Sequence, residues 1–465
     1  MTTSARTDAP VTSTSDKNDR REIFGWKMYD WANSAFYTTV VGTLFGPYLT
    51  RLAQAAVGEN GVVLDLGPLG HVTAKGLPTL CVSISVGAQV FVLPILGALG
   101  DYSNLKKRLM ALFCYLGVVA NCLLFFIHGN LYLAGGVLFI VANICFGASL
   151  VFYNAFLPEI TTDDQADRVS SRGYAYGYLG GALLLVFNLL LVLQAERLGI
   201  STGLAVRLSL LSAGVWWGAF ALITFSLLKD RPAKKNLPPG KSYISAGFSE
   251  LAETFKELRR LPLTARYLLG YLIYNDGIQT VIFASSTFLE QELFPGEGNP
   301  TFLLEIFVMV QFVAVAGALL FERLAYIIKT KNAIIVSLVI WSGIVIYANR
   351  FLDSVPEAWV MAGVIAIVLG GSQALSRSLY SKMIPAGKEA SFFGLYEVSE
   401  RGTSWMGPLL FSLVVSRTGS YRIALLSLIF FFVVGLVVLW LTDTDRAIRE
   451  SQQSTEPSAV APRQV

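Results

Sequence analysis

The stretch KMYDWANSAFYTTVVGTLFGPYL, residues 27–49, starts with polar and charged side chains and continues as a long apolar run. A helix needs about 20 mostly apolar residues to cross a hydrocarbon layer of roughly 30 Å. Asp30 and Asn33 are three residues apart, so they share one face of such a helix. The stretch therefore predicts a membrane-spanning helix that contains a carboxylate and an amide.

The composition of the whole chain supports a membrane protein. Of its 465 residues, 54% are hydrophobic and 15% are charged, whereas soluble domains carry about 25% charged residues. The alternating ten-residue segments of a β-barrel are not found. We therefore predict an all-α integral membrane protein. At about 20 residues per crossing, the apolar runs give about twelve spans, at 26–51, 78–100, 109–128, 131–157, 172–194, 208–228, 264–289, 301–321, 332–351, 357–383, 391–416 and 421–442.

Basic residues are distributed unevenly between the expected loops. Most of the 36 Lys and Arg residues lie in the termini and in alternate junctions, including Lys106, Lys107 and Arg108. Because Lys and Arg favour the cytosolic side, we expect both termini to be cytosolic. The net charge of +4 reflects this bias and does not indicate a nucleic-acid partner. The four cysteines lie in spans at spacings that fit neither disulfides nor a metal site, and we expect no cofactor.

The longest internal polar stretch divides the spans six and six. It contains Phe248, Leu251, Phe255 and Leu258 on one helical face, which predicts an amphipathic helix on the lipid surface or a solvated connector. The predicted organisation is a disordered cytosolic N-terminus at 1–25, a six-helix bundle at 26–228, a cytosolic linker at 229–263, a second six-helix bundle at 264–442 and a disordered cytosolic tail at 443–465.

The two halves share short sequence similarities in the same order. "GAL" at 97–99 precedes Asp101, and "GAL" at 317–319 precedes Glu322. "YNAFLP" at 153–158 has a counterpart in "YSKMIP" at 380–385. Such internal repeats are typical of transporters built from related halves.

The segment GALGDYSNLKKR, 97–108, resembles the signature between spans 2 and 3 of the major facilitator superfamily. Gly97, Asp101, Lys106 and Arg108 fill its positions, although the gap between the acid and the bases is longer here. A glycine allows close helix approach, and the acid can pair with a neighbouring helix end in a gate. The alternative is an ordinary basic cytosolic loop.

Four further blocks give a narrower resemblance. They are YDWANSAFYTTV (29–40), SRGYAYGYLGG (171–181), YNDGIQTV (274–281) and GGSQALSRSLYSKMIP with FFGLYEVSERG (370–402). These look like the autophagy-related vacuolar effluxer branch and its bacterial "unknown major facilitator" relatives. The resemblance implies efflux of amino acids or similar small solutes, and it favours a bacterial inner membrane.

Polar residues inside the spans are the candidate binding site, because an intramembrane charge usually faces a cavity or a partner. Asp276 lies about twelve residues into its span, on the order of 18 Å deep, with Gln279 on the same face. Asp30 and Asn33 lie nearer the cytosolic end. We expect all four to line a central cavity; the alternatives are a structural hydrogen bond for Asp276 and helix capping or a cytosolic gate for Asp30 and Asn33.

Two further spans carry charged residues. Glu400 and Arg401 complete the expected lining of the cavity. Glu400 would be protonated, pair across helices or bind a cationic group of the substrate, and Arg401 can also pair with Glu397 along one helical face. Arg377 lies near the cytosolic end of its span. It can pair with Glu397 or Asp30 as an inner gate, or extend to the lipid headgroups.

The function that these features predict is secondary transport by alternating access. The predicted substrate is an amino acid or a similar zwitterion, because the expected lining holds both acids and bases, and protons could couple the transport through Glu400 or Asp276. A membrane enzyme is disfavoured, because the chain has no phosphate-binding loop and no histidine-rich metal motif. A lipid-handling protein of the same fold is the alternative.

Overall fold

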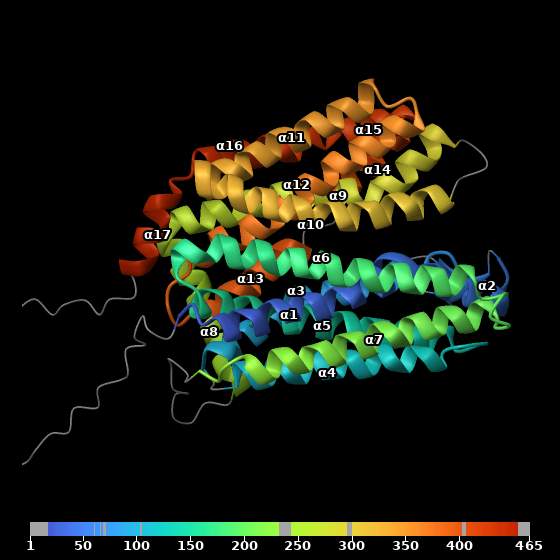
Figure 1. The fold of residues 1–465 in the computed structure, drawn as a ribbon, viewed down its shortest axis with the longest axis horizontal. Coiled ribbons are helices and arrows are strands. Elements are labelled where there is room, and N and C mark those ends of the chain that lie inside the picture. Colours follow the sequence, from blue (N-terminus) through green and yellow to red (C-terminus); the bar gives the residue numbers. More distant parts are fainter. Residues whose placement is uncertain are drawn as a thin grey trace, which may run out of the picture.

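The computed structural model describes residues 17–59, 61–65, 67, 71–102, 105–231, 243–294, 300–401 and 406–453. Figure 1 shows two groups of roughly parallel helices lying side by side, with α1 to α7 in one group and α9 to α12 and α14 to α16 in the other, while α13 lies against α3 of the first group. Each group has its own large cluster of buried apolar side chains. The predicted all-helical architecture with two six-helix halves is confirmed.

The first half contains six spans. Span 1 is continuous from α1 (Arg20–Ala35) through a π-helix, η2 (Phe36–Leu44), into α2 (Phe45–Val57). The other five are α3 (Leu77–Tyr102), α4 (Lys106–Leu123, followed by a 3₁₀ turn at Leu124–Phe126), α5 (Tyr132–Ile160), α6 (Asp163–Leu193) and α7 (Thr202–Leu227).

The second half repeats this arrangement after a linker helix, α8 (Tyr243–Arg260). Its span 11 is described in two parts, on either side of residues 402–405, and span 12 has a short irregularity. The elements are α9 (Pro262–Leu293), α10 (Pro300–Ile328), α11 (Thr330–Arg350), α12 (Val355–Lys382), α13 (Glu389–Arg401) with α14 (Met406–Thr418), and α15 (Tyr421–Ser427) with α16 (Ile429–Trp440).

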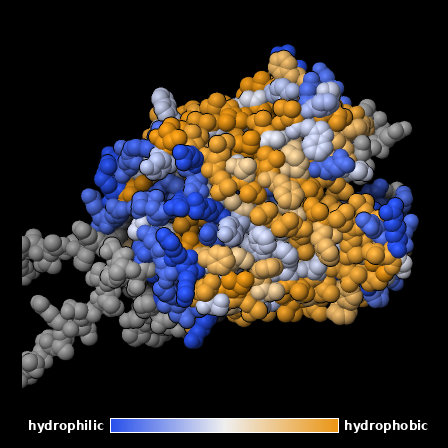
Figure 2. Space-filling view, in the orientation of Figure 1, coloured by the Kyte–Doolittle hydropathy of each residue, from blue (hydrophilic) through white to orange (hydrophobic). Residues whose placement is uncertain are grey.

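Nine helices in the described part of the chain are long and apolar enough to cross a membrane by themselves. The remaining three spans are α1 to α2, α9, and α13 with α14. These are the spans that carry Asp30, Asp276 and Glu400. Figure 2 shows an apolar surface over the middle of the helices and hydrophilic residues gathered at both ends.

The two ends of the bundle differ in structure. At one end, called the terminal end, α1 begins and α17 (Thr444–Gln453) lies (Figure 1). At the other, called the hairpin end, a short antiparallel pair of strands, β1 (Val62–Asp65) and β2 (His71–Thr73), connects α2 to α3. The sequence analysis did not predict this hairpin.

Three expectations about the polar segments need correction. The N-terminal segment that we expected to be disordered becomes helical from Arg20, and the tail contains α17, because Ala447 and Ser451 are buried against the bundle. The amphipathic helix α8 packs on protein, since Leu251 and Leu258 contact the core of the second half, while Phe255 is 50% exposed. The termini themselves lie outside the described residues.

Candidate functional site

A cavity of about 1420 Å³ lies between the two halves. Its lining runs from Asp30 and Arg377, deep in the bundle, to Arg51 and Thr202 at the hairpin end. Six of the residues predicted from the sequence line it: Asp30, Asn33, Gln279, Arg377, Glu397 and Glu400. The structure therefore brings together polar side chains from α1, α9, α12 and α13 in one cavity.

The floor of the cavity is a chain of polar contacts that joins the halves. Arg377 Nη2 lies 3.2 Å from Asp30 Oδ2, and its Nη1 donates to Asn154 Oδ1 at 3.3 Å. Asn154 Nδ2 in turn donates to Glu397 Oε1 at 2.6 Å. Because Asp30 and Asn154 belong to the first half and Arg377 and Glu397 to the second, this network closes the cavity toward the terminal end.

The guanidinium of Arg377 is held on several sides. Its Nε donates to Ser170 Oγ at 3.0 Å, and its Nη2 also donates to the Ser170 carbonyl at 3.1 Å. The rings of Trp26, Tyr153 and Tyr174 lie 4.9, 5.6 and 4.2 Å from it. Such contacts with aromatic faces stabilise a buried cation. Of the two roles that we considered for Arg377, the pairing with Asp30 is present, and extension to the headgroups is not.

Asp30 has a second partner that the sequence analysis missed. The Tyr153 hydroxyl donates to Asp30 Oδ2 at 2.6 Å. Tyr153 and Asn154 begin the YNAFLP block, which we singled out only as a repeat. The presence of two hydrogen-bonding side chains deep in an apolar helix was the available evidence for their role.

Beyond this floor, toward the hairpin end, the lining of the cavity contains amides and tyrosines. The Tyr178 hydroxyl donates to Gln373 Oε1 at 3.0 Å across the two halves. Asn33 is 4% exposed, and its Nδ2 has no hydrogen-bond partner among the described residues. A donor left unpaired at a cavity wall is available to a ligand or water.

Asp276 does not line the cavity, contrary to our expectation. It is fully buried, and its Oδ2 accepts the backbone N–H of Gly407 at 2.7 Å. Gly407 lies on α14, so this hydrogen bond links Asp276 of span 7 to span 11. Asp276 therefore occupies the structural position that we considered as the alternative. The side chain of Arg401, with its expected pairing to Glu397, lies outside the described residues.

A second set of contacts closes the terminal end at α3 and α13. Asp101 Oδ1 accepts the N–H of Ala390 at 2.9 Å, and its Oδ2 accepts the N–H of Ser391 at 2.8 Å and its hydroxyl at 2.5 Å. A Cβ on Gly97 would lie 2.3 Å from the Ala390 carbonyl oxygen. The acid and the glycine of the signature segment therefore fix the start of α13 against the first half.

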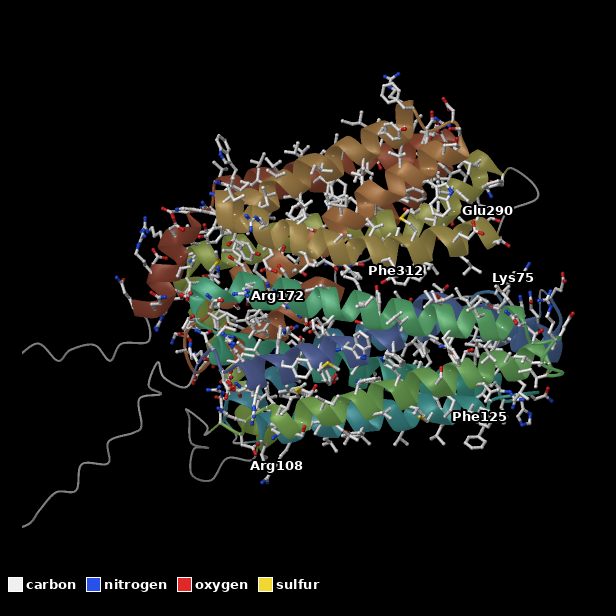
Figure 3. All side chains as sticks on the ribbon, in the orientation of Figure 1. Lys75, Arg108, Phe125, Arg172, Glu290 and Phe312 are labelled. Atoms are coloured by element: carbon white, nitrogen blue, oxygen red, sulfur yellow. The ribbon has the colours of Figure 1, made fainter. Side chains whose placement is uncertain are left out.

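The basic residues of the same segment differ in their surroundings. Lys106 Nζ donates to Glu159 Oε1 at 2.8 Å within the first half. Arg108 is exposed and points away from the bundle in Figure 3. Only Lys106 is placed near the closing contacts, so a gating role for Arg108 has no support from its position.

The second half contributes a matching contact to α6. Glu322 accepts from Arg172 Nε at 3.2 Å and lies 3.8 Å from Arg168 Nε. Arg172 is labelled in Figure 3 at the boundary between the halves. Asp167 on α6 accepts from Lys382 Nζ at 2.9 Å. Glu322 follows the second "GAL" as Asp101 follows the first, so both copies of the repeat hold the halves together at the terminal end.

Comparisons with known proteins agree with this architecture. The chain matches the family described as vacuole effluxer Atg22 like over residues 18–452. The uncharacterized MFS-type transporter YxiO of Bacillus subtilis (strain 168) is 31% identical, over 93% of this chain and 97% of its own length. Autophagy-related protein 22 of Kluyveromyces lactis is 26% identical, over 93% of this chain and 96% of its own length.

Solved structures support the fold. The human organic anion transporter MFSD10 aligns with a TM-score of 0.67 and 14% identity, covering 90% of this chain and 99% of that chain. The Escherichia coli fucose:proton symporter FucP aligns with a TM-score of 0.65 and 12% identity, covering 91% of this chain and 98% of that chain. The fold is that of the major facilitator superfamily, a superfamily of transporters and not of enzymes. By the match over nearly its whole length, this chain belongs to the Atg22-like vacuole effluxer family.

Proposed function

We propose that this protein exports amino acids or similar small zwitterions by alternating access. The observation that carries the proposal is the cavity of about 1420 Å³, which reaches the hairpin end and ends at a polar floor between the halves. Related halves that rock around such a site expose it to each side in turn. The contacts of Asp101, Glu322 and Arg377 would then have to break when the terminal end opens.

The charges of the lining favour a zwitterion. Arg377 is the basic group at the floor, and Asp30, Glu397 and Glu400 are the acidic groups. A substrate that carries both charges can interact with an acid and a base at once, whereas an apolar solute would leave these groups desolvated at a cost.

We further propose that the terminal end faces the cytosol of a bacterial cell and that the protein lies in the cell membrane. The basic linker and the Lys106 to Arg108 group belong to this end, in agreement with the positive-inside rule. With this orientation the cavity is open to the outside.

The test of the function is transport by purified protein in proteoliposomes with labelled L-amino acids. We expect Glu400→Gln to lower the transport rate tenfold or more, because the variant keeps the shape of the side chain and removes its charge from the cavity. The matched control is Glu196→Gln, since Glu196 is exposed and lies outside the lining. Equal rates for wild type and Glu400→Gln would contradict the assignment of Glu400. Absence of amino-acid transport by the wild type, with transport of labelled lipid instead, would contradict the substrate class.

A further inference from the structure

A group of basic side chains near the terminal end has no part in the cavity. Lys27, Arg168 and Arg172 lie outside the cavity lining. Lys27 belongs to α1, and the two arginines belong to α6, which packs beside α1. Figure 3 labels Arg172 at the boundary between the halves. The proposed transport site therefore leaves the position of these three charges unexplained.

Lys27 is a half-buried lysine of span 1 without a carboxylate partner. Its ammonium lies over the ring of Tyr176, 4.8 Å from the ring centre. The ring of Phe24 packs edge-on against the same tyrosine, at 6.5 Å between centres. Within the described chain Lys27 forms no hydrogen bond and no ion pair. Because an aromatic face attracts a cation without neutralising it, this lysine keeps a positive charge that no acid balances.

The neighbouring charges leave the group strongly positive. Glu322 of α10 lies 3.2 Å from Arg172 Nε and 3.8 Å from Arg168 Nε, so two arginines share one carboxylate. Both arginines repel the Lys27 ammonium, and Glu322 attracts it. Asp167, the residue before Arg168, is engaged by a lysine of α12. Two of the three positive charges are therefore unbalanced among the described residues.

The group lies at the level expected for lipid headgroups. α6 has 31 residues, or about 46 Å at 1.5 Å per residue, so it extends beyond a hydrocarbon layer of about 30 Å. Lys27 and Arg172 lie seven and nine residues from the starts of α1 and α6 at the terminal end, and long basic side chains extend from such depths to the headgroups. Tyr326, one turn beyond Glu322 on α10, is 91% exposed, and exposed tyrosines are typical of this layer.

The chemistry of the group matches a lipid phosphate. A phosphate offers several charged acceptor oxygens to nearby donors, and the planar guanidinium of arginine is well suited to it. Anionic phospholipids attract basic side chains at a membrane surface. A phosphatidylcholine headgroup carries its own cation beside the phosphate, whereas a phosphatidylglycerol headgroup does not. The unbalanced positive charge therefore favours an anionic phospholipid.

We propose that Lys27, Arg168 and Arg172 form a binding site for the phosphate of an anionic phospholipid. The ammonium reaches the phosphate from α1 and the two guanidinium groups reach it from α6, while the Tyr176 ring keeps the ammonium in place. Arg172 also contacts Glu322 of the second half, so the bound lipid lies beside a contact that joins the halves. The site does not depend on the identity of the transported solute.

The test measures lipid binding by the purified full-length protein in detergent, with native mass spectrometry. Phosphatidylglycerol and phosphatidylcholine with the same acyl chains are added at equal concentrations. We expect the wild type to bind phosphatidylglycerol at least fivefold more tightly. Lys27→Gln should lower this affinity about fivefold, because one basic group near a membrane surface contributes about 1 kcal/mol. The control is Lys75→Gln, which removes an exposed charge at the hairpin end (Figure 3) and should bind like the wild type.

Thermal unfolding separates a lipid site from a general anion site. A ligand that binds the folded state stabilises it, so phosphatidylglycerol should raise the melting temperature of the wild type by about 2 °C or more and that of Lys27→Gln by clearly less. Inorganic phosphate at constant ionic strength should leave both melting temperatures unchanged. Equal stabilisation by inorganic phosphate and by phosphatidylglycerol would contradict a lipid site. Equal affinity of the wild type for the two lipids, or of the wild type and Lys27→Gln for phosphatidylglycerol, would overturn the proposal.

Arg168→Gln decides the question if Lys27→Gln does not fold. The Arg168 side chain is 55% exposed, so its replacement leaves the packing of α6 intact, and we expect a similar, about fivefold, loss of affinity for phosphatidylglycerol. Unchanged binding by this variant would overturn the proposal. None of these measurements uses transport. A wild type that binds phosphatidylglycerol as expected but does not transport amino acids would therefore contradict the proposed function and support the lipid site.

Discussion

Arg377→Ala is expected to abolish transport and to open the terminal end of the bundle. The ion pair with Asp30 is 3% and 11% exposed at its two side chains, and removal of one partner of a buried pair costs about 3–5 kcal/mol. The variant also removes the donors to Ser170 and Asn154, and with them the connection to Glu397. The halves would lose the network that joins them at the cavity floor.

The measurement is labelling of a cysteine placed at Ser34, a half-buried residue of the cavity lining, with the native cysteines replaced. A membrane-impermeant thiol reagent added from the terminal side should label it at least tenfold faster in Arg377→Ala. The control is Arg350→Ala, because Arg350 is exposed at the hairpin end of α11. Arg377→Lys should restore closure only in part, since an ammonium group cannot reproduce the planar set of donors. Unchanged labelling in Arg377→Ala would contradict a gating role for the pair.

Gly97→Ala is expected to have a comparable effect through shape alone. Its Cβ would lie 2.3 Å from the Ala390 carbonyl oxygen and 3.2 Å from Gly394 Cα, so the backbones of α3 and α13 would have to separate. That separation would also lengthen the hydrogen bonds from Ala390 and Ser391 to Asp101. We expect a lower melting temperature, faster labelling at position 34 from the terminal side and at least a tenfold loss of transport.

Gly363→Ala is the matched control for this variant. Gly363 lies inside α12, and no atom lies within 4 Å of the position of an added Cβ. Alanine is favoured over glycine within a helix by about 1 kcal/mol, so this control should be neutral or slightly stabilising. Opposite signs for the two substitutions are the expected result. A Gly97→Ala protein that melts and transports like Gly363→Ala would show that close contact of α3 with α13 is not required.

The sequence predicted the site less well than the fold. It identified Asp30, Asn33, Gln279 and Glu400 as lining residues from their place in apolar spans, and these residues line the cavity. The same argument placed Asp276 in the cavity, although its side chain is buried and accepts the N–H of Gly407. Depth along a helix follows from residue count, but the direction of a side chain depends on how the neighbouring helices pack around it.

What the sequence determined by itself is the membrane-spanning architecture. Segment length, hydropathy and the placement of Lys and Arg can be read from neighbouring residues along the chain. Together they predicted twelve spans in two halves. Which buried charges meet depends on the tertiary structure. Asp30 and Arg377 are 347 positions apart, and they form a pair because α1 and α12 come together at the boundary of the halves. The sequence of either segment alone does not indicate this contact, because the contact forms only when the two helices pack together on folding.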